Sequence, residues 1–254
     1  MRIEEIMREF ETEIKTDDGV MDVFVCHPEQ DGPHPAVILY MDAPGIREEL
    51  RDMARRMGTV GYTVLLPNMY YRTGREGHYG YDLARFRDDE GERAKMFEVM
   101  NTLTNARVVH DTKGLLAFID QCEAAAAGPV GCVGYCMSGR FITCAAGTFP
   151  DIFKASASLY GVGIVTDQDD SSHYMVKHIT GEIYFGFAET DGTVPSFVHP
   201  TLQAELKEHG TNAIFEVHPG TGHGFCFESR DVYDKAAAEK VWKVFFDMCK
   251  RNLG

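Results

Sequence analysis

The stretch "VGYCMSGR" (residues 133–140) decides the fold, because it places a cysteine among small residues where a strand pattern becomes a helix pattern. The apolar run before it, residues 129–135, is typical of a strand buried on both faces. Residues 137–149 then show a helical pattern. This arrangement matches the nucleophile elbow, a strained turn that lifts its central side chain above a parallel sheet. Such a turn needs small neighbours, and Gly134, Ser138 and Gly139 satisfy that need.

The elbow makes Cys136 a candidate nucleophile. Exposed N–H groups and the dipole at a helix N-terminus stabilise a thiolate and, later, an oxyanion. The N–H of Met137 is one expected oxyanion donor. The second is expected from the loop after the apolar run 36–41, near Asp42 and Ala43. The alternative is a cysteine that only packs at a strand end, since single motifs also occur by chance.

An acid and a base follow Cys136 in the order that this architecture requires, each after an apolar run. The run "GEIYFGFA" (residues 181–188) precedes "ETDGTVP", which makes Asp191 the expected acid and Glu189 the second choice. The run "NAIFEVHP" (residues 212–219) precedes "GTGHGF", where His223 lies between two glycines. Glycines allow a histidine loop to approach another backbone closely. We therefore expect Cys136, His223 and Asp191 to form a triad.

The other histidines and cysteines fit structural roles better. His218 lies inside a predicted strand, His110 lies on a predicted helix, and residues 172–178 are expected to form a surface loop. Cys226 is close to His223 in sequence and could line the site. Five further cysteines are interpreted as packing residues: Cys26, Cys122, Cys132, Cys144 and Cys249.

Composition narrows the classes of partner. The chain has 254 residues and a formal net charge of −14, which argues against nucleic acid as a partner. The N-terminal residues show no signal-peptide pattern, and the apolar run 36–41 is too short to span a membrane. Seven cysteines without a repeating framework indicate a reducing, cytoplasmic location. The spacing of these cysteines does not match the ligand spacing of a structural zinc site, so we expect no metal.

The predicted elements indicate one α/β domain over residues 1–254. Strand and helix patterns alternate from residue 36 onward, which favours a mostly parallel sheet with helices on both faces. Two strand patterns around "DDG" (residues 17–19) predict an antiparallel hairpin before that sheet. The polar stretch from residue 70 to about 95 is expected to be a functional loop or irregular helix.

Five segments together resemble the dienelactone hydrolase family of α/β-hydrolases: "YMDAPGIRE" (40–48), "GYTVLLPNMYYR" (61–72), "GYCMSG" (134–139), "AETDGTVP" (188–195) and "GTGHGF" (220–225). The resemblance implies the α/β-hydrolase fold and the Cys136–His223–Asp191 triad. It also implies that Asp42 contacts the resting thiol and that Arg93 binds a substrate carboxylate. Arg75, Arg85 and Arg87 remain alternatives for that arginine, and if Arg93 faces the pocket, we expect an anionic substrate to draw it away from Asp42. Phe227 stands where well-known members carry a second substrate-binding arginine.

The expected activity is hydrolysis of a small-molecule lactone or activated enol or aryl ester through an acyl-thioester intermediate, with no cofactor or metal. A stable alkyl ester is a poorer substrate, because a thiolate leaves its adduct more easily than an alkoxide does. Two alternatives remain open. One is a general carboxylesterase or thioesterase on the same scaffold, and the other is a non-catalytic module for ligand binding or redox sensing.

Overall fold

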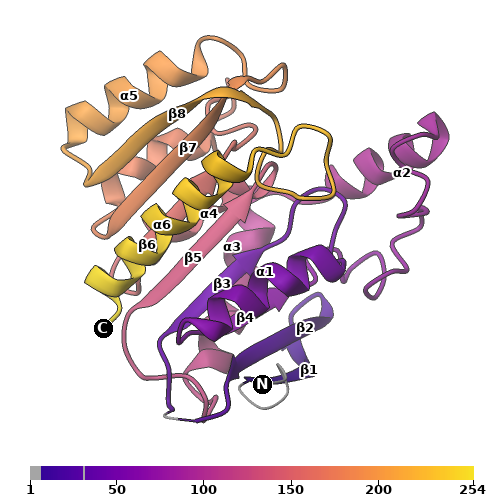
Figure 1. Ribbon diagram of the computed structural model, residues 1–254, viewed down its shortest axis with the longest axis vertical. Helices are drawn as coiled ribbons and strands as arrows, with labels where there is room; N and C mark the ends of the chain where they lie inside the picture. Colours follow the sequence, from indigo (N-terminus) through magenta and orange to yellow (C-terminus); the bar gives the residue numbers. More distant parts are fainter. Residues whose placement is uncertain (1–6, 31) are drawn as a thin grey trace. The chain divides into compact units, whose positions relative to one another are not determined.

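The computed structural model describes residues 7–30 and 32–254. The chain divides into two compact units, Met1–Ala127 and Gly128–Gly254, and each is described here by itself. Figure 1 shows the elements of both, coloured along the sequence. The single domain expected over residues 1–254 stays a prediction.

The strands of the first unit begin with the hairpin that the sequence predicted. Strand β1 (Met7–Thr16) pairs antiparallel with β2 (Gly19–Pro28) around the turn at residues 17–18. Strand β2 pairs antiparallel with β4 (Thr63–Pro67), and β4 pairs parallel with β3 (Ala36–Tyr40). The order within the unit is therefore β1-β2-β4-β3. Every residue of β3 and β4 is buried, as the continuous apolar runs predicted.

Helices α1, α2 and α3 complete the described part of the first unit. Helix α1 (Glu48–Thr59) ends just before Gly61, whose φ of 106° only glycine adopts easily. Helix α2 (Glu90–Met100) begins inside the polar stretch, where the Asp89 carboxylate accepts N–H bonds from the first turn. Helix α3 spans Asn105–Ile119. It carries His110, whose Nε2 lies 3.0 Å from a carboxylate oxygen of Asp17.

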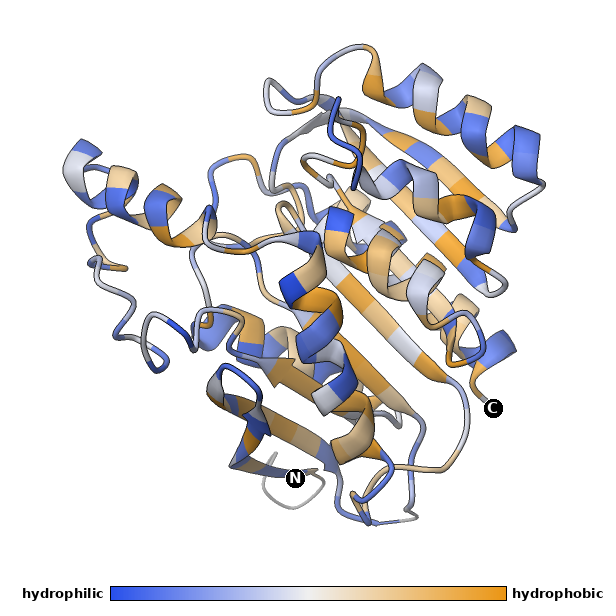
Figure 2. Cartoon of the chain, turned by 180° about the vertical axis from the view of Figure 1, so that it is seen from behind, coloured by the Kyte–Doolittle hydropathy of each residue, from blue (hydrophilic) through white to orange (hydrophobic). Residues whose placement is uncertain are grey.

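The second unit is a parallel sheet in the order β5-β6-β7-β8. Its strands are β5 (Val130–Tyr135), β6 (Phe153–Leu159), β7 (Glu182–Thr190) and β8 (Ala213–Gly222). The connecting and closing helices are α4 (Ser138–Thr148), α5 (Val198–His209) and α6 (Lys235–Asn252). In Figure 1, α6 passes in front of the strands and α4 lies behind them, so helices cover both faces. Figure 2 shows apolar residues along these strands, interrupted by hydrophilic ones.

One prediction for the second unit is wrong. Residues 172–178 form a short 3-10 helix, η2 (Ser172–His178), rather than a surface loop. His173 and Val176 are buried because η2 packs against α4. The His173 ring nitrogen Nδ1 lies 2.7 Å from the Ser171 hydroxyl, and its backbone N–H donates to the carbonyl of Ile164. These bonds give its Nδ1 and its backbone N–H partners inside the unit.

Within the described ranges, no helix combines the length and the apolar character needed to cross a bilayer.

Candidate active site

Cys136 lies on the sharp turn between β5 and α4, with a φ of 55°. A side chain at Gly134 would approach the Ser138 Cβ to 2.9 Å, and one at Gly139 would approach the Gly161 Cα to 2.3 Å. Both distances are too short for carbon atoms, so the elbow requires small residues at these positions, as the sequence predicted. Met137 follows the cysteine and caps the N-terminus of α4.

Cys136 also differs in environment from most of the other cysteines. Cys136 is partly exposed, whereas Cys26, Cys132 and Cys144 are buried. Burial raises the pKa of each of these three thiols to about 12. A thiol with such a pKa remains protonated at neutral pH and is a poor nucleophile. Burial also raises the pKa of Cys226, which counts against a chemical role for that thiol.

Asp191 and His223 meet at the carboxyl ends of β7 and β8. Oδ2 of Asp191 lies 2.6 Å from Nδ1 of His223. Oδ1 of the same carboxylate accepts hydrogen bonds from the backbone N–H of Thr193 at 2.9 Å and from its hydroxyl at 2.6 Å. Burial by itself would raise the pKa of Asp191. The hydrogen bonds from His223 and Thr193 outweigh burial and hold this pKa below its usual range, so the group is a carboxylate at neutral pH.

His223 has the opposite shift. Burial by itself would lower its pKa, but hydrogen bonds to Asp191 and Cys136, together with their charges, raise it to about 9. The imidazole therefore lies between the carboxylate and the sulfur, and it readily holds a proton. A nucleophile bonded to a base that is oriented by a third group is the arrangement expected for covalent catalysis.

Glu189, the second choice for the acid, binds the backbone instead of the imidazole. Its Oε2 accepts the backbone N–H of Gly220 at 2.9 Å, which ties the end of β7 to the histidine loop. His218 is buried, and its Nε2 lies 2.7 Å from the Tyr184 hydroxyl. Burial lowers the pKa of His218, so this ring is neutral at physiological pH. Neither residue competes with the Asp191–His223 pair.

The comparison of the sequence with protein-family models identifies the family. The model described as "Dienelactone hydrolase family" matches residues 21–253. The chain belongs to the dienelactone hydrolase family. It is thus a dienelactone hydrolase-like enzyme of the carboxylic ester hydrolase class, as the motifs implied.

Individual relatives agree with this assignment. A "Putative carboxymethylenebutenolidase" of Methylorubrum extorquens is 26% identical over 246 residues, which cover 93% of this chain and 79% of that protein. A protein of the same name from Synechocystis sp. is 25% identical and covers 91% of each chain. The crystal structure titled "Putative Dienelactone Hydrolase" from Klebsiella pneumoniae has a TM-score of 0.84 at 21% identity, and the match covers 96% of this chain and 99% of that one. This likeness confirms the α/β-hydrolase fold.

The first unit contains Asp42, Ala43 and Arg93, which the sequence also selected. Asp42 is fully buried, and its two oxygens accept hydrogen bonds from the Arg47 guanidinium at 2.6 and 3.2 Å. The Ala43 carbonyl accepts the Tyr70 hydroxyl at 2.7 Å. Arg93 lies on α2, where its guanidinium donates to a backbone carbonyl at residue 87. The described partner of the Asp42 carboxylate is thus Arg47, a residue that the sequence analysis did not select.

Sequence reasoning missed Arg47, although the residue closes the short segment "DAPGIR" (residues 42–47). The turn in this segment, held by a bond from the Gly45 N–H to the Asp42 carbonyl, brings the two side chains together. A buried carboxylate needs a partner, and the nearest arginine in sequence was the available signal.

Phe227 is fully buried in the second unit. Its ring centre lies 5.2 Å from that of Tyr135 and 6.4 Å from that of Tyr160. The Arg230 guanidinium lies over the same ring at 5.4 Å, and a side chain at Gly224 would meet Arg230 atoms at 2.7 Å. Arg230 therefore lies beside the residue that follows His223, although it is out of register with the family's second arginine.

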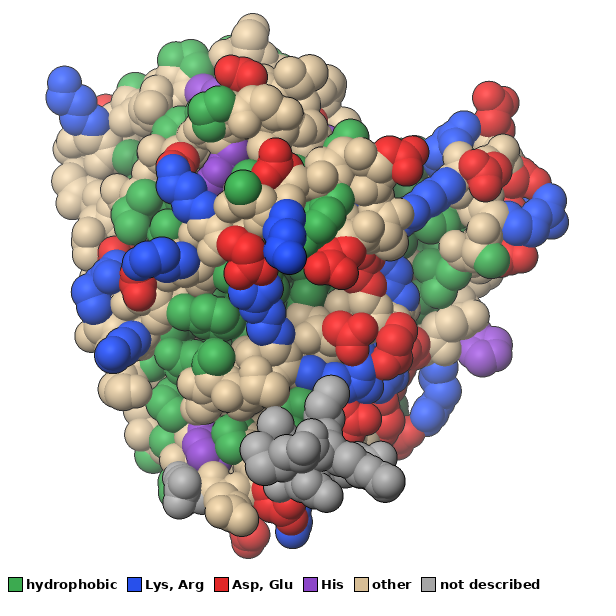
Figure 3. All heavy atoms as spheres, in the orientation of Figure 1, with side chains coloured by type: hydrophobic (Ala, Val, Ile, Leu, Met, Phe, Trp, Pro, Cys, Tyr) green, Lys and Arg blue, Asp and Glu red, His purple; other side chains and the backbone are tan. Residues whose placement is uncertain are grey.

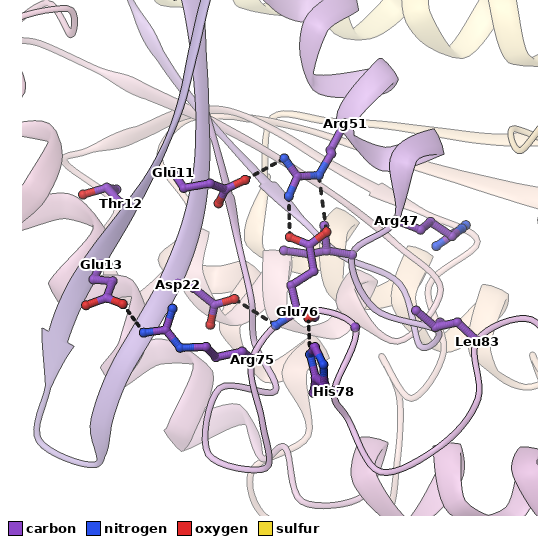
Figure 4. A pocket seen from close by; sticks show the side chains of 12 residues that line it. Glu11, Thr12, Glu13, Asp22, Arg47, Arg51, Arg75, Glu76, His78 and Leu83 are labelled. Atoms are coloured by element: carbon purple, nitrogen blue, oxygen red, sulfur yellow. Dashed lines mark hydrogen bonds and ion pairs between the residues drawn. The ribbon is translucent and has the colours of Figure 1, made fainter.

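A cavity of about 900 Å³ lies in the first unit. The residues that line it fall between Glu11 and Leu83 in the sequence, and none of them belongs to the proposed triad. Figure 4 shows that charged side chains from β1, α1 and the following loops line it and bind one another. Arg51 bridges Glu11 and Glu76, and Arg75 binds Glu13. Acidic and basic side chains are likewise intermixed on the face shown in Figure 3. These mutual pairs indicate a structural role for the charges around the cavity.

Among the described residues, no group of three or more His, Cys, Asp or Glu side chains is arranged to hold a metal ion.

Proposed function

We propose that this hydrolase cleaves a lactone or an activated enol or aryl ester through a covalent acyl-thioester on Cys136. The observation that carries the proposal is the 2.6 Å bond between Asp191 Oδ2 and His223 Nδ1, together with the bond from His223 to Cys136. In this proposal Cys136 is the nucleophile, His223 is the general base and acid, and Asp191 orients the imidazole.

The first half-reaction forms the acyl-enzyme. With the proton that the pair shares resting on His223 Nε2, the Cys136 Sγ attacks the substrate carbonyl carbon as a thiolate and forms a C–S bond. The resulting oxyanion accepts the N–H of Met137 and, as second donor, the N–H of Ala43. When the tetrahedral adduct collapses, the ester C–O bond breaks and the imidazolium gives its proton to the departing oxygen.

The second half-reaction consumes water. His223 takes a proton from a water molecule, which attacks the thioester carbon, and the C–S bond breaks to return the thiol and release a carboxylic acid. An enol or phenol oxygen leaves much more easily than an ordinary alkoxide. We therefore propose activated esters and enol lactones as the substrates, with a general carboxylesterase or thioesterase activity as the alternative.

Acylation of Cys136 provides the test. Incubation with an aryl acetate should add one acetyl group to Cys136, visible by mass spectrometry, and phenol release should show a burst followed by turnover. Cys136→Ala should abolish both while the protein stays folded. Cys136→Ser should also be slow, because a hydroxyl needs a stronger base than a thiol does.

Cys122→Ala is the matched control, because Cys122 is another partly exposed cysteine and lies outside the proposed site. This variant should turn over normally. Near-normal hydrolysis by Cys136→Ala would reject the proposed triad. Reversible oxidation of Cys136 without acylation would instead favour the redox-sensing alternative.

The cellular setting is part of the proposal. All seven cysteines lie in the described residues and none is in a disulfide. Unpaired thiols in this number suit a reducing compartment, and we propose the cytoplasm.

A further inference from the structure

The backbone of Cys136 is held on both sides by the segment that follows β6. Its N–H donates to the carbonyl of Leu159 at 3.0 Å, and its carbonyl accepts the N–H of Val162, also at 3.0 Å. These two hydrogen bonds bracket Tyr160 and Gly161. The turn that carries the proposed nucleophile is thus fastened to a second turn on the neighbouring strand.

The second turn is strained as well. Tyr160 has a φ of 36°, and it is the only described residue besides Cys136, glycines excepted, with a positive φ. This conformation costs a bulky L-residue about 1–3 kcal/mol and persists only where the surroundings enforce it. Glycine would adopt it without that cost. A tyrosine here is therefore expected to contribute through its side chain.

The Tyr160 side chain is fully buried, and its ring packs edge-on against the imidazole of His223. The ring centres lie 5.1 Å apart with an interplanar angle of 67°. Phe225 packs on Tyr160 in a similar geometry at 5.3 Å. One side chain thus joins the strained turn beside Cys136 to the ring of the proposed base.

We propose that Tyr160 is a positioning residue, whose ring fixes the plane of His223 relative to Cys136 and Asp191. The inference rests on the proposed function. The backbone of residues 159–162 holds the nucleophile turn, and the ring rising from the same segment holds the base. A shift of either partner is then transmitted to the other. In reactions that depend on such alignment, a misplacement of about 1 Å costs on the order of a hundredfold in rate.

The test compares two substitutions. Tyr160→Phe keeps the ring and removes the hydroxyl, and acylation of Cys136 should stay within about threefold of the original rate. Tyr160→Leu keeps an apolar side chain and removes the ring, and acylation should slow by about ten- to a hundredfold with little change in KM. Each acylation rate is normalised by the burst amplitude, because that amplitude measures the fraction of protein molecules whose site can react. If Tyr160→Leu does not fold, Tyr160→Met takes its place, because methionine adapts to irregular core space.

A second readout separates positioning from a loss of stability. The pKa of His223, followed by NMR, should fall toward 6.5 in Tyr160→Leu because its bonds to Asp191 and Cys136 weaken, and it should stay near its original value in Tyr160→Phe. Tyr184→Leu is the matched control, since it removes another buried tyrosine of the same unit whose hydroxyl contacts His218 instead. It should lower stability and leave the His223 titration unchanged.

The outcomes distinguish the two proposals. Fast acylation and an unshifted His223 titration in Tyr160→Leu would overturn the positioning role of Tyr160. A loss of acylation rate in Tyr160→Phe as large as that in Tyr160→Leu would also overturn it, because the ring is retained in Tyr160→Phe. Absence of Cys136 acylation in the unmodified protein would instead reject the proposed function itself.

Discussion

The carboxylate of Asp191 contacts His223 through one oxygen only. Oδ2 lies 2.6 Å from Nδ1, while Oδ1 is occupied by the N–H and hydroxyl of Thr193. Because a carboxylate only accepts hydrogen bonds, Nδ1 must carry the proton. Nε2 is then the nitrogen that takes up and returns the Cys136 proton.

Asp191→Asn should lower acylation and turnover by about three to four orders of magnitude, by analogy with the acids of other triads. The amide can donate to Nδ1 and so favours the wrong tautomer. Steady-state rates on an aryl ester provide the measurement. Glu189→Gln is the control and should change little, because Glu189 contacts the Gly220 N–H instead of the imidazole. A larger loss in the control than in Asp191→Asn would assign the acid role to Glu189.

Thr193→Val should slow acylation by about ten- to a hundredfold. The substitution preserves the side-chain shape and removes a hydrogen bond to a charged carboxylate, which is worth about 1.5–3 kcal/mol. Freed from the hydroxyl, the Asp191 carboxylate can rotate away from Nδ1. Thr193→Ser restores the hydroxyl and should recover most of the rate. Equal activity of the valine and threonine proteins would show that the backbone N–H alone orients Asp191.

The titration of His223 should make stability depend on pH. Its folded pKa of about 9 lies above the ordinary 6.5, so the stabilisation is fully present below pH 6.5 and is lost as pH rises through 9. The free energy of unfolding in urea should therefore fall by on the order of 2–3 kcal/mol more between pH 6.5 and 9.5 than it does in His223→Gln. Cys136→Ser should show a smaller fall, because Cys136 contributes to the raised pKa. If the unfolding free energy depended on pH in the same way in the unmodified protein, His223→Gln and Cys136→Ser, the result would contradict a raised pKa at His223.

Much of the second unit could be predicted from the sequence, because its determinants are local. The elbow depends on small residues within a few positions of Cys136, and Asp191 and His223 directly follow apolar runs that form strands. The "DGT" pattern also contains an Asp whose side chain binds the N–H two residues on, a recognised turn. Other features depend on packing between segments distant in sequence. The burial of His173 and the contact of Tyr160 with His223 required the folded chain.

In the first unit, the sequence likewise could not predict which arginine contacts Asp42. Arg93 was assigned from the family resemblance, by an ungapped match back from Asp111, and a slip of a few residues changes which arginine is chosen. The structure brings Arg47 to Asp42 through a local turn, and it places Arg93 in the first turn of α2. The role of Arg93 in substrate binding stays a prediction.

Selectivity for anionic substrates can be tested through Arg93. Its guanidinium is partly exposed on α2, which leaves it able to bind a ligand, and a charge-assisted hydrogen bond is worth about 1.5–3 kcal/mol. Arg93→Ala should therefore lower kcat/KM on a carboxylate-bearing lactone by about ten- to a hundredfold and leave a neutral aryl ester nearly unchanged. Arg87→Ala is the matched control, because it removes a neighbouring arginine and retains the backbone carbonyl that Arg93 contacts. Equal losses on both substrates would make Arg93 structural, and a selective loss in Arg87→Ala would transfer the role to that residue. Because Phe227 is buried at the position where the family resemblance implies a second arginine, we expect lactones with one carboxylate and an apolar substituent to be preferred over dianionic ones.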